Sequence, residues 1–221
     1  MITNTAPDYS RQFVAKYTLE AGDIDQIGYA TISNTGSLGA FTGATVPAIA
    51  SATYDLDVTI DGGGLNQLAV ALLNTDDWDG IAAKIQTALR TATGSTETVA
   101  IVAGKIQITS ATAGSTSTVL IAAGTAGSGG GDLLAAITAL GATYTATLDT
   151  PVDGTEASVA IVLTDVSTFT DFVGSVTIDD STDVQKIATI RKVFSSGTLT
   201  ISDTTTTLAA GDKININGAL V

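Results

Sequence analysis

The sequence predicts a mainly β protein that carries an α+β module. Segments near both ends of the 221-residue chain alternate apolar and polar residues, which is typical of strands with one buried face. Apolar residues at helical spacing occur within residues 54–148. The polar stretch 149–154, which contains Pro151 and an Asp-Gly pair, separates that module from the strands that follow. We therefore expect a β-rich domain built from the N- and C-terminal flanks, with an α+β domain inserted between them.

The flanks are predicted to form one discontinuous assembly domain. Residues 1–10 are polar and contain Pro7, so we expect an arm that orders only against a neighbouring molecule. Residues 11–50 and 155–221 together make the β-rich domain, because neither flank alone has enough strands to be stable. The strands predicted in the flanks cover residues 11–20, 27–33, 158–164, 174–178, 184–194, 199–202 and 213–217. Residues 165–172 fit either a strand edge or a helical turn.

The α+β module, residues 54–148, opens with an alternating strand. Tyr54, Leu56, Val58 and Ile60 fall on every second position, and the intervening Asp residues are expected on the other, solvated face. A helix is predicted over residues 76–89, because Trp78 begins an apolar stripe at helical spacing. The same stripe predicts that Trp78 lies in the core. Asp76 and Asp77 stand where a helix cap is needed.

Further short elements complete the module. Strands are expected over 68–73, 99–102, 105–110 and 117–122, and a helix over 132–140. Ala103-Gly104 predicts a tight hairpin turn, and Gly141 predicts the end of the second helix. Residues 127–131 (Gly-Ser-Gly-Gly-Gly) stand before this helix but lack the spacing and the lysine of a phosphate-binding loop, which favours a flexible loop.

Charge and composition exclude several functions. The net charge of −13 disfavours nucleic acid as a partner. The only basic cluster, Lys186, Arg191 and Lys192, is typical of an edge strand protected by charge. With no Cys, the chain has no disulfide or thiolate nucleophile. No secretory signal is visible, and the longest apolar run, around residues 157–163, is too short to span a bilayer, so we expect no membrane partner.

Catalysis and cofactors are not expected. The chain has no His, which removes the commonest general base and most metal sites. Two Asp-rich segments, 23–25 and 179–183, are the densest candidates for calcium, but neither fits the EF-hand loop, and turn formation is the simpler role. An Asp-based glycosidase stays as a distant alternative, although sugar clefts usually carry more aromatic residues than this chain has.

The central module resembles a domain of phage particles. The stretches that carry the resemblance are Tyr-Asp-Leu-Asp-Val-Thr-Ile-Asp-Gly (54–62), Trp-Asp-Gly-Ile-Ala-Ala-Lys-Ile-Gln-Thr-Ala-Leu (78–89), Lys-Ile-Gln-Ile-Thr-Ser (105–110) and Asp-Leu-Leu-Ala-Ala-Ile-Thr-Ala-Leu-Gly (132–141). They are similar to the small α+β domain of some contractile-tail sheath proteins and other phage virion proteins, and to the IN motif of flagellar hook and filament-cap proteins. The chain lacks the large joining domains of sheath proteins. The resemblance implies a decorating domain on a polymeric particle, with no active-site residue.

These features together predict a phage virion structural protein, with a capsid decoration (cement) protein that stabilises the head shell as the leading hypothesis. The expected partners are the major capsid protein or other virion subunits and further copies of the chain, and the head surface is favoured over the tail. The residues expected to contact partners are Tyr9, Arg11, Phe13, Lys186 and Lys192. A tail component (tube, completion or fibre-attachment protein) and a surface or flagellar accessory binding module remain alternatives.

Overall fold

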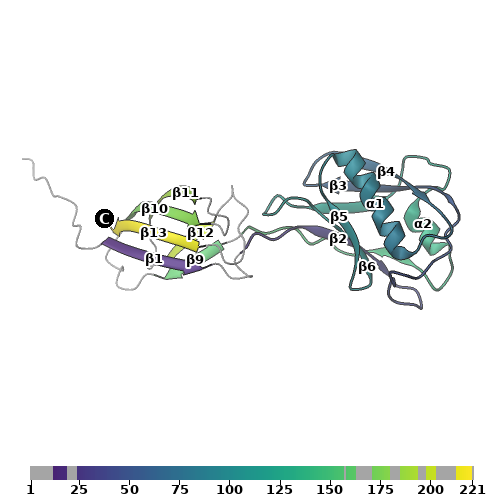
Figure 1. The fold of residues 1–221 in the computed structure, drawn as a ribbon, viewed down its shortest axis with the longest axis horizontal. Helices are drawn as coiled ribbons and strands as arrows, with labels where there is room; N and C mark the ends of the chain where they lie inside the picture. Colours follow the sequence, from purple (N-terminus) through teal and green to yellow (C-terminus); the bar gives the residue numbers. More distant parts are fainter. Residues whose placement is uncertain are drawn as a thin grey trace, which may run out of the picture. The chain divides into compact units, whose positions relative to one another are not determined.

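The computed structural model describes residues 12–18, 24–156, 158–162, 171–179, 185–193, 198–202 and 213–220. The described part contains thirteen strands and two helices, so the prediction of a mainly β chain with some helix is confirmed (Figure 1). The chain divides into two compact units: a central unit, Gln26–Thr155, and a flank unit formed by the residues on either side of it.

The flank unit combines strands from both ends of the chain. Its larger sheet is antiparallel and has the order β1 (Gln12–Thr18), β13 (Lys213–Leu220), β10 (Asp171–Asp179) and β11 (Gln185–Val193). The first and last strands of the chain are therefore neighbours, with Gln12 opposite Ala219 and Thr18 opposite Lys213. A second sheet pairs β12 (Thr198–Ser202) with β9 (Ser158–Val162).

Residues 26–50, which the sequence assigns to the flank domain, lie in the central unit instead. The strand predicted there exists as β2 (Tyr29–Asn34), but it pairs with β6 (Lys105–Thr109) and β8 (Ala146–Leu148). Alternation of apolar residues identifies a strand without identifying its partners, and those partners decide the domain boundary.

The central unit contains two sheets and two helices. One sheet has the order β4 (Leu65–Leu72), β3 (Ala52–Ile60), β7 (Val119–Ala123), and the other has the order β5 (Thr98–Val102), β6, β2, β8. Helix α1 (Trp78–Thr93) packs against β4 and β5, and α2 (Leu133–Thr138) lies near β8 and β3 (Figure 1). One hydrophobic core joins these elements.

Helix α1 confirms the predicted helix and its Asp77 cap, but it runs from Trp78 to Thr93 instead of over 76–89. The Asp77 side chain accepts a hydrogen bond from the Gly80 N–H at 2.7 Å, and Gly94 ends the helix in the left-handed conformation with φ of 70°. The buried face consists of Trp78, Ile81, Ala82, Ile85 and Leu89. Trp78 is fully buried in a cluster of aromatic rings with Phe41 and Tyr144, as its spacing predicts.

The β5–β6 hairpin is also confirmed, because Ala103 and Gly104 both have positive φ, 49° and 75°. Positive φ at both central residues is the conformation that matches the twist of the flanking strands. The second helix is shorter than the predicted 132–140: Asp132 caps it, and its last helical residue is Thr138.

Candidate interaction surfaces

The predicted partner-contact residues fall on the flank unit. Tyr9 and Arg11 lie outside the described residues. Phe13 belongs to β1, whereas Lys186 and Lys192 belong to β11. In the described part of the flank unit these are the two edge strands of the larger sheet, separated by β13 and β10. Phe13 is thus not brought together with the two lysines, and both sets stand on sheet edges where a further strand could pair.

The calcium candidates give no site in the described chain. Asp23 and residues 180–183 lie outside it. Among the residues that the structure describes, no group of three or more His, Cys, Asp or Glu side chains could hold a metal ion. No helix in the described segments is long and apolar enough to cross a membrane.

The Asp residues of β3 are buried, contrary to the expected solvated face. Asp55 is 1% exposed and Asp57 is 2% exposed. Asp55 accepts a hydrogen bond from the Ser128 N–H at 2.7 Å, and Asp57 accepts bonds from the N–H and the hydroxyl of Thr125 at 3.3 and 2.6 Å. Hydrogen bonding by the Ser128 side chain, assisted by the N–H groups of Ser128 and Gly127, holds the pKa of Asp55 below its usual range although burial opposes this shift. These carboxylates anchor a loop.

That loop is the Gly-rich segment, residues 124–131, and it is fastened along β3. The Gly130 N–H donates to the Thr53 carbonyl at 2.9 Å, and the Asp55 N–H donates to the Gly131 carbonyl at 2.8 Å. A Cβ on Gly130 would come within 2.7 Å of the Thr53 oxygen, so close backbone approach explains this glycine. The loop expected to be flexible is therefore held along β3 by these backbone hydrogen bonds and by the bonds from Thr125 and Ser128 to the Asp carboxylates. Its glycines permit this close approach.

Asp61, just beyond β3, anchors a second loop in the same way. Its carboxylate accepts hydrogen bonds from the hydroxyls of Ser110 and Thr112 and from the Thr118 N–H. Three Asp residues from one alternating strand and its turn thus fix the two loops that flank β7. Sequence alternation places these residues on one face but gives no sign of the loops that cover them.

A further polar cluster surrounds Asp149. Its Oδ2 atom accepts hydrogen bonds from Ser33 Oγ at 2.5 Å, Thr31 Oγ1 at 2.6 Å and Lys105 Nζ at 2.9 Å. The two hydroxyls and then the ammonium group lower the pKa of Asp149 to about 2. The cluster borders a hollow of about 330 Å³ that Tyr29 also lines. A carboxylate with so low a pKa is a weak general base at neutral pH, so the cluster is suited to fastening β2 and β6 to the chain after β8.

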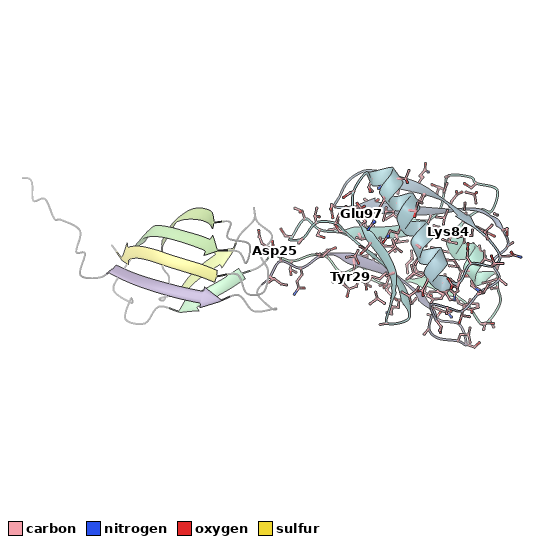
Figure 2. The ribbon with its side chains drawn as sticks, viewed as in Figure 1. Asp25, Tyr29, Lys84 and Glu97 are labelled. Atoms are coloured by element: carbon pink, nitrogen blue, oxygen red, sulfur yellow. The ribbon has the colours of Figure 1, made fainter. Side chains whose placement is uncertain are left out.

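The chain enters and leaves the central unit through paired segments, which we call the stem (residues 26–29 and 152–155). The Gln26 N–H donates to the Thr155 carbonyl at 2.7 Å, and the Thr155 N–H donates back to Gln26 at 3.3 Å. Tyr29 and Val152 exchange backbone bonds of 2.8 and 2.9 Å, and Figure 2 labels Tyr29 at this end of β2. A Cβ on Gly154 would meet the carbonyl oxygens of Gly114 and Gln26 at 2.4 and 2.6 Å, so the stem is closely packed.

A groove of about 470 Å³ lies between β4 and α1. Its β4 side is formed by Gln67, Leu68, Ala69 and Ala71, and its α1 side by Lys84, Thr87, Ala88, Thr91 and Ala92. Lys84, labelled on α1 in Figure 2, is the only charged residue that lines it, and its Nζ atom pairs with Asp76. Burial acts to raise the pKa of Asp76, but the Leu73 N–H and Lys84 together lower it. The groove is thus largely neutral and is lined mostly by small side chains.

No family model matches this chain, and no curated protein matches it either.

Proposed function

We propose that the chain is a phage virion structural protein, a capsid decoration protein that binds the head shell as a homo-oligomer. In this proposal the flank unit and the segment before β1 hold the shell and neighbouring copies, and the central unit is an inserted α+β domain that is displayed on the particle. Binding is mechanical: contacts that exist only on the assembled lattice stabilise that lattice by mass action.

The stem is the observation that carries this proposal. Gln26 and Thr155 exchange backbone hydrogen bonds, so both crossings of the chain between the two units are adjacent. Strands from both ends of the chain complete one sheet of the flank unit, with β1 beside β13. Such a connection supports a division of labour, in which one unit attaches and the other is carried as an insertion.

The use of acidic side chains supports a structural role rather than catalysis. Carboxylates that could serve as general acids or bases instead accept hydrogen bonds from loops, caps and strands of the same unit. The residues used in this way are Asp55, Asp57, Asp61, Asp77, Asp132 and Asp149.

The attachment surface is proposed to include both edges of the larger flank sheet. Phe13 lies in the edge strand β1, with Tyr9 and Arg11 shortly before it in the sequence, and Lys186 and Lys192 lie in the other edge strand, β11. An unpaired strand edge can accept a strand or loop of a neighbour, and lysines on such an edge limit non-specific pairing. The proposed partners are the major capsid protein and further copies of this chain.

Electron microscopy of intact particles tests the proposal. Particles are assembled with the full chain or with a chain that lacks residues 2–11, which leaves β1 in place. We expect density for the full chain on the head surface and loss of most of that density after the deletion. Full occupancy by the shortened chain would refute the role of the arm. Density on the tail would favour the tail-component alternative, and no density on any particle would overturn the proposal.

A further inference from the structure

The open edge of β4 offers a second place where a strand can be added. We propose that the groove between β4 and α1 binds residues 2–6 of a second copy of this chain as an additional β-strand. The inference rests on the homo-oligomer in the proposed function and names the contact that would build it.

The direction of the backbone groups shows which part of β4 is open. In β3, the Thr53 carbonyl and the Asp55 N–H bond to residues 130 and 131, on the side away from β4. Because successive residues of a strand point their N–H and C=O groups to opposite sides, Tyr54 and Leu56 must face β4. Their partners in β4 are Val70 and Leu68.

The backbone N–H and C=O groups of the odd-numbered residues of β4 therefore point away from β3. Three of these residues, Gln67, Ala69 and Ala71, also line the groove. No backbone hydrogen bond in the described part of the chain engages their outward N–H or C=O groups, and β4 is an edge strand there. The edge closes at Leu73, whose N–H donates to the Asp76 carboxylate at 2.7 Å. Five residues, 67–71, thus form an open pairing edge beside a helix.

The groove lining leaves room for a further backbone. Ala69 and Ala71 border it from β4, and Thr87, Ala88, Thr91 and Ala92 border it from α1. An extended peptide that pairs with an open edge gains main-chain hydrogen bonds, and the adjacent groove accepts alternate side chains. The small side chains on both walls favour β-branched or small side chains in the incoming strand.

The charge and length of residues 2–6 fit this groove. Their sequence, Ile-Thr-Asn-Thr-Ala, is uncharged, as is the groove once Lys84 is paired with Asp76. Three of the five residues are β-branched, a type enriched in strands, and Pro7 then ends the pairing. Five residues match the open edge 67–71. Residues 7–11 would link this strand to β1, with a reach of roughly 17 Å at about 3.3 Å per residue.

A second copy is the donor in this proposal because the homo-oligomer of the proposed function requires a contact between copies. Cysteine pairs test this directly, since the natural chain contains no Cys. Full-length Thr3→Cys is mixed with full-length Ala71→Cys and treated with a short bismaleimide cross-linker. We expect a cross-linked heterodimer, and a much lower yield when Ala83→Cys, an exposed position of α1 outside the groove, replaces Ala71→Cys.

Groove variants of the full chain test the same contact without cross-linking. Ala69→Pro removes one outward N–H, and Ala92→Trp fills the groove from α1; each is expected to weaken self-association about tenfold or more, as measured by sedimentation. Ala83→Trp is the matched control for Ala92→Trp and should leave self-association unchanged. Deletion of residues 2–6 should weaken it to the same extent as the groove variants.

The outcomes separate this inference from the proposed function. Equal cross-linking at Ala71→Cys and Ala83→Cys, or undiminished self-association of Ala69→Pro and Ala92→Trp, would overturn the inference while particle binding could still hold. Loss of self-association in the groove variants but not after the deletion would show another occupant and would also overturn it. Cross-linking of Thr3 to Ala71 only within a doubly substituted chain would make the pairing internal and reject a second copy. Specific heterodimers from a chain that is absent from particles would sustain the inference and reject the proposed function.

Discussion

The two faces of the β4–β3–β7 sheet are buried by different means. On one face, apolar side chains such as Leu56 and Leu68 lie in the hydrophobic core that also contains Ile85 of α1. On the opposite face, Asp55 and Asp57 are buried just as completely beneath the Gly-rich loop 124–131. One face depends on close packing of apolar side chains. The other depends on hydrogen bonds from the loop to Asp55 Oδ2 and to both oxygens of Asp57, whereas Asp55 Oδ1 is buried without a partner.

The largest effect is expected on the helix-covered face. Ile85→Ala should lower the free energy of unfolding of the central unit by about 3 kcal/mol, because it removes fully buried volume that the core cannot recover. Urea unfolding followed by the fluorescence of Trp78, the only Trp in the chain, reports on this unit. Thr87→Ala on the exposed side of the same helix should change the free energy by less than about 0.5 kcal/mol. Equal effects of the two substitutions would contradict the buried stripe.

A smaller loss is expected on the loop-covered face. Asp57→Ala should lower the free energy of unfolding by about 2 kcal/mol, because it leaves the Thr125 N–H and hydroxyl without their acceptor. Thr125→Val should cost less, since it keeps the backbone bond. The two effects should be non-additive in a double-mutant cycle.

Asp153→Ala, at an exposed position, serves as the control and should be nearly neutral. If Asp57→Ala were equally neutral, the loop would not depend on its carboxylate. Hydrogen exchange at the Asp55 N–H, which donates to Gly131, would then show whether the loop still lies along β3.

The same contrast explains what could be predicted from the sequence. Periodicity predicted α1, the buried Trp78 and the strands of the module, because an element with one apolar face must bury that face. The position of Asp77 before the apolar stripe predicted the cap. It could not show that Asp55 and Asp57 are buried, because their partners in residues 124–131 are far along the chain and carry no pattern. The partner contacts predicted in the arm and the edge strands stay predictions, whereas the sequence gives little sign of the β4/α1 groove. Its one sequence signal is the line of small residues Thr87, Ala88, Thr91 and Ala92 on one side of a helix.

The stem boundary was missed for a related reason. Residues 149–154 mark a boundary through Pro151 and Asp153-Gly154, and the central unit does end at Thr155. The sequence around Gln26, where the central unit begins, has no comparable Pro or Asp-Gly signal. Only the backbone pairing of Gln26 with Thr155 reveals this boundary, and pairing between residues so far apart is not encoded in local propensity.

The smallest effect tests a carboxylate anchor that is only partly buried. The pKa of Asp149 falls from 3.8 to about 2 through the hydroxyls of Ser33 and Thr31 and the ammonium group of Lys105. A lowered folded-state pKa means that the charged form stabilises the fold above about pH 4 and that this contribution is lost as the pH falls from about 4 toward 2. Asp149→Asn should therefore reduce the free energy of unfolding by about 1 kcal/mol at pH 7, and its difference from the natural chain should shrink over that acid window.

Lys105→Gln, which keeps both hydroxyl donors, should have a smaller effect that decreases with added salt. A difference between Asp149→Asn and the natural chain that stayed constant from pH 7 to pH 2 would mean that the charge of Asp149 does not hold β2 to the chain after β8. Its side chain is about one-third exposed, so this anchor should cost less to lose than Asp57, and the ratio of the two measures what burial adds to one hydrogen-bonded carboxylate.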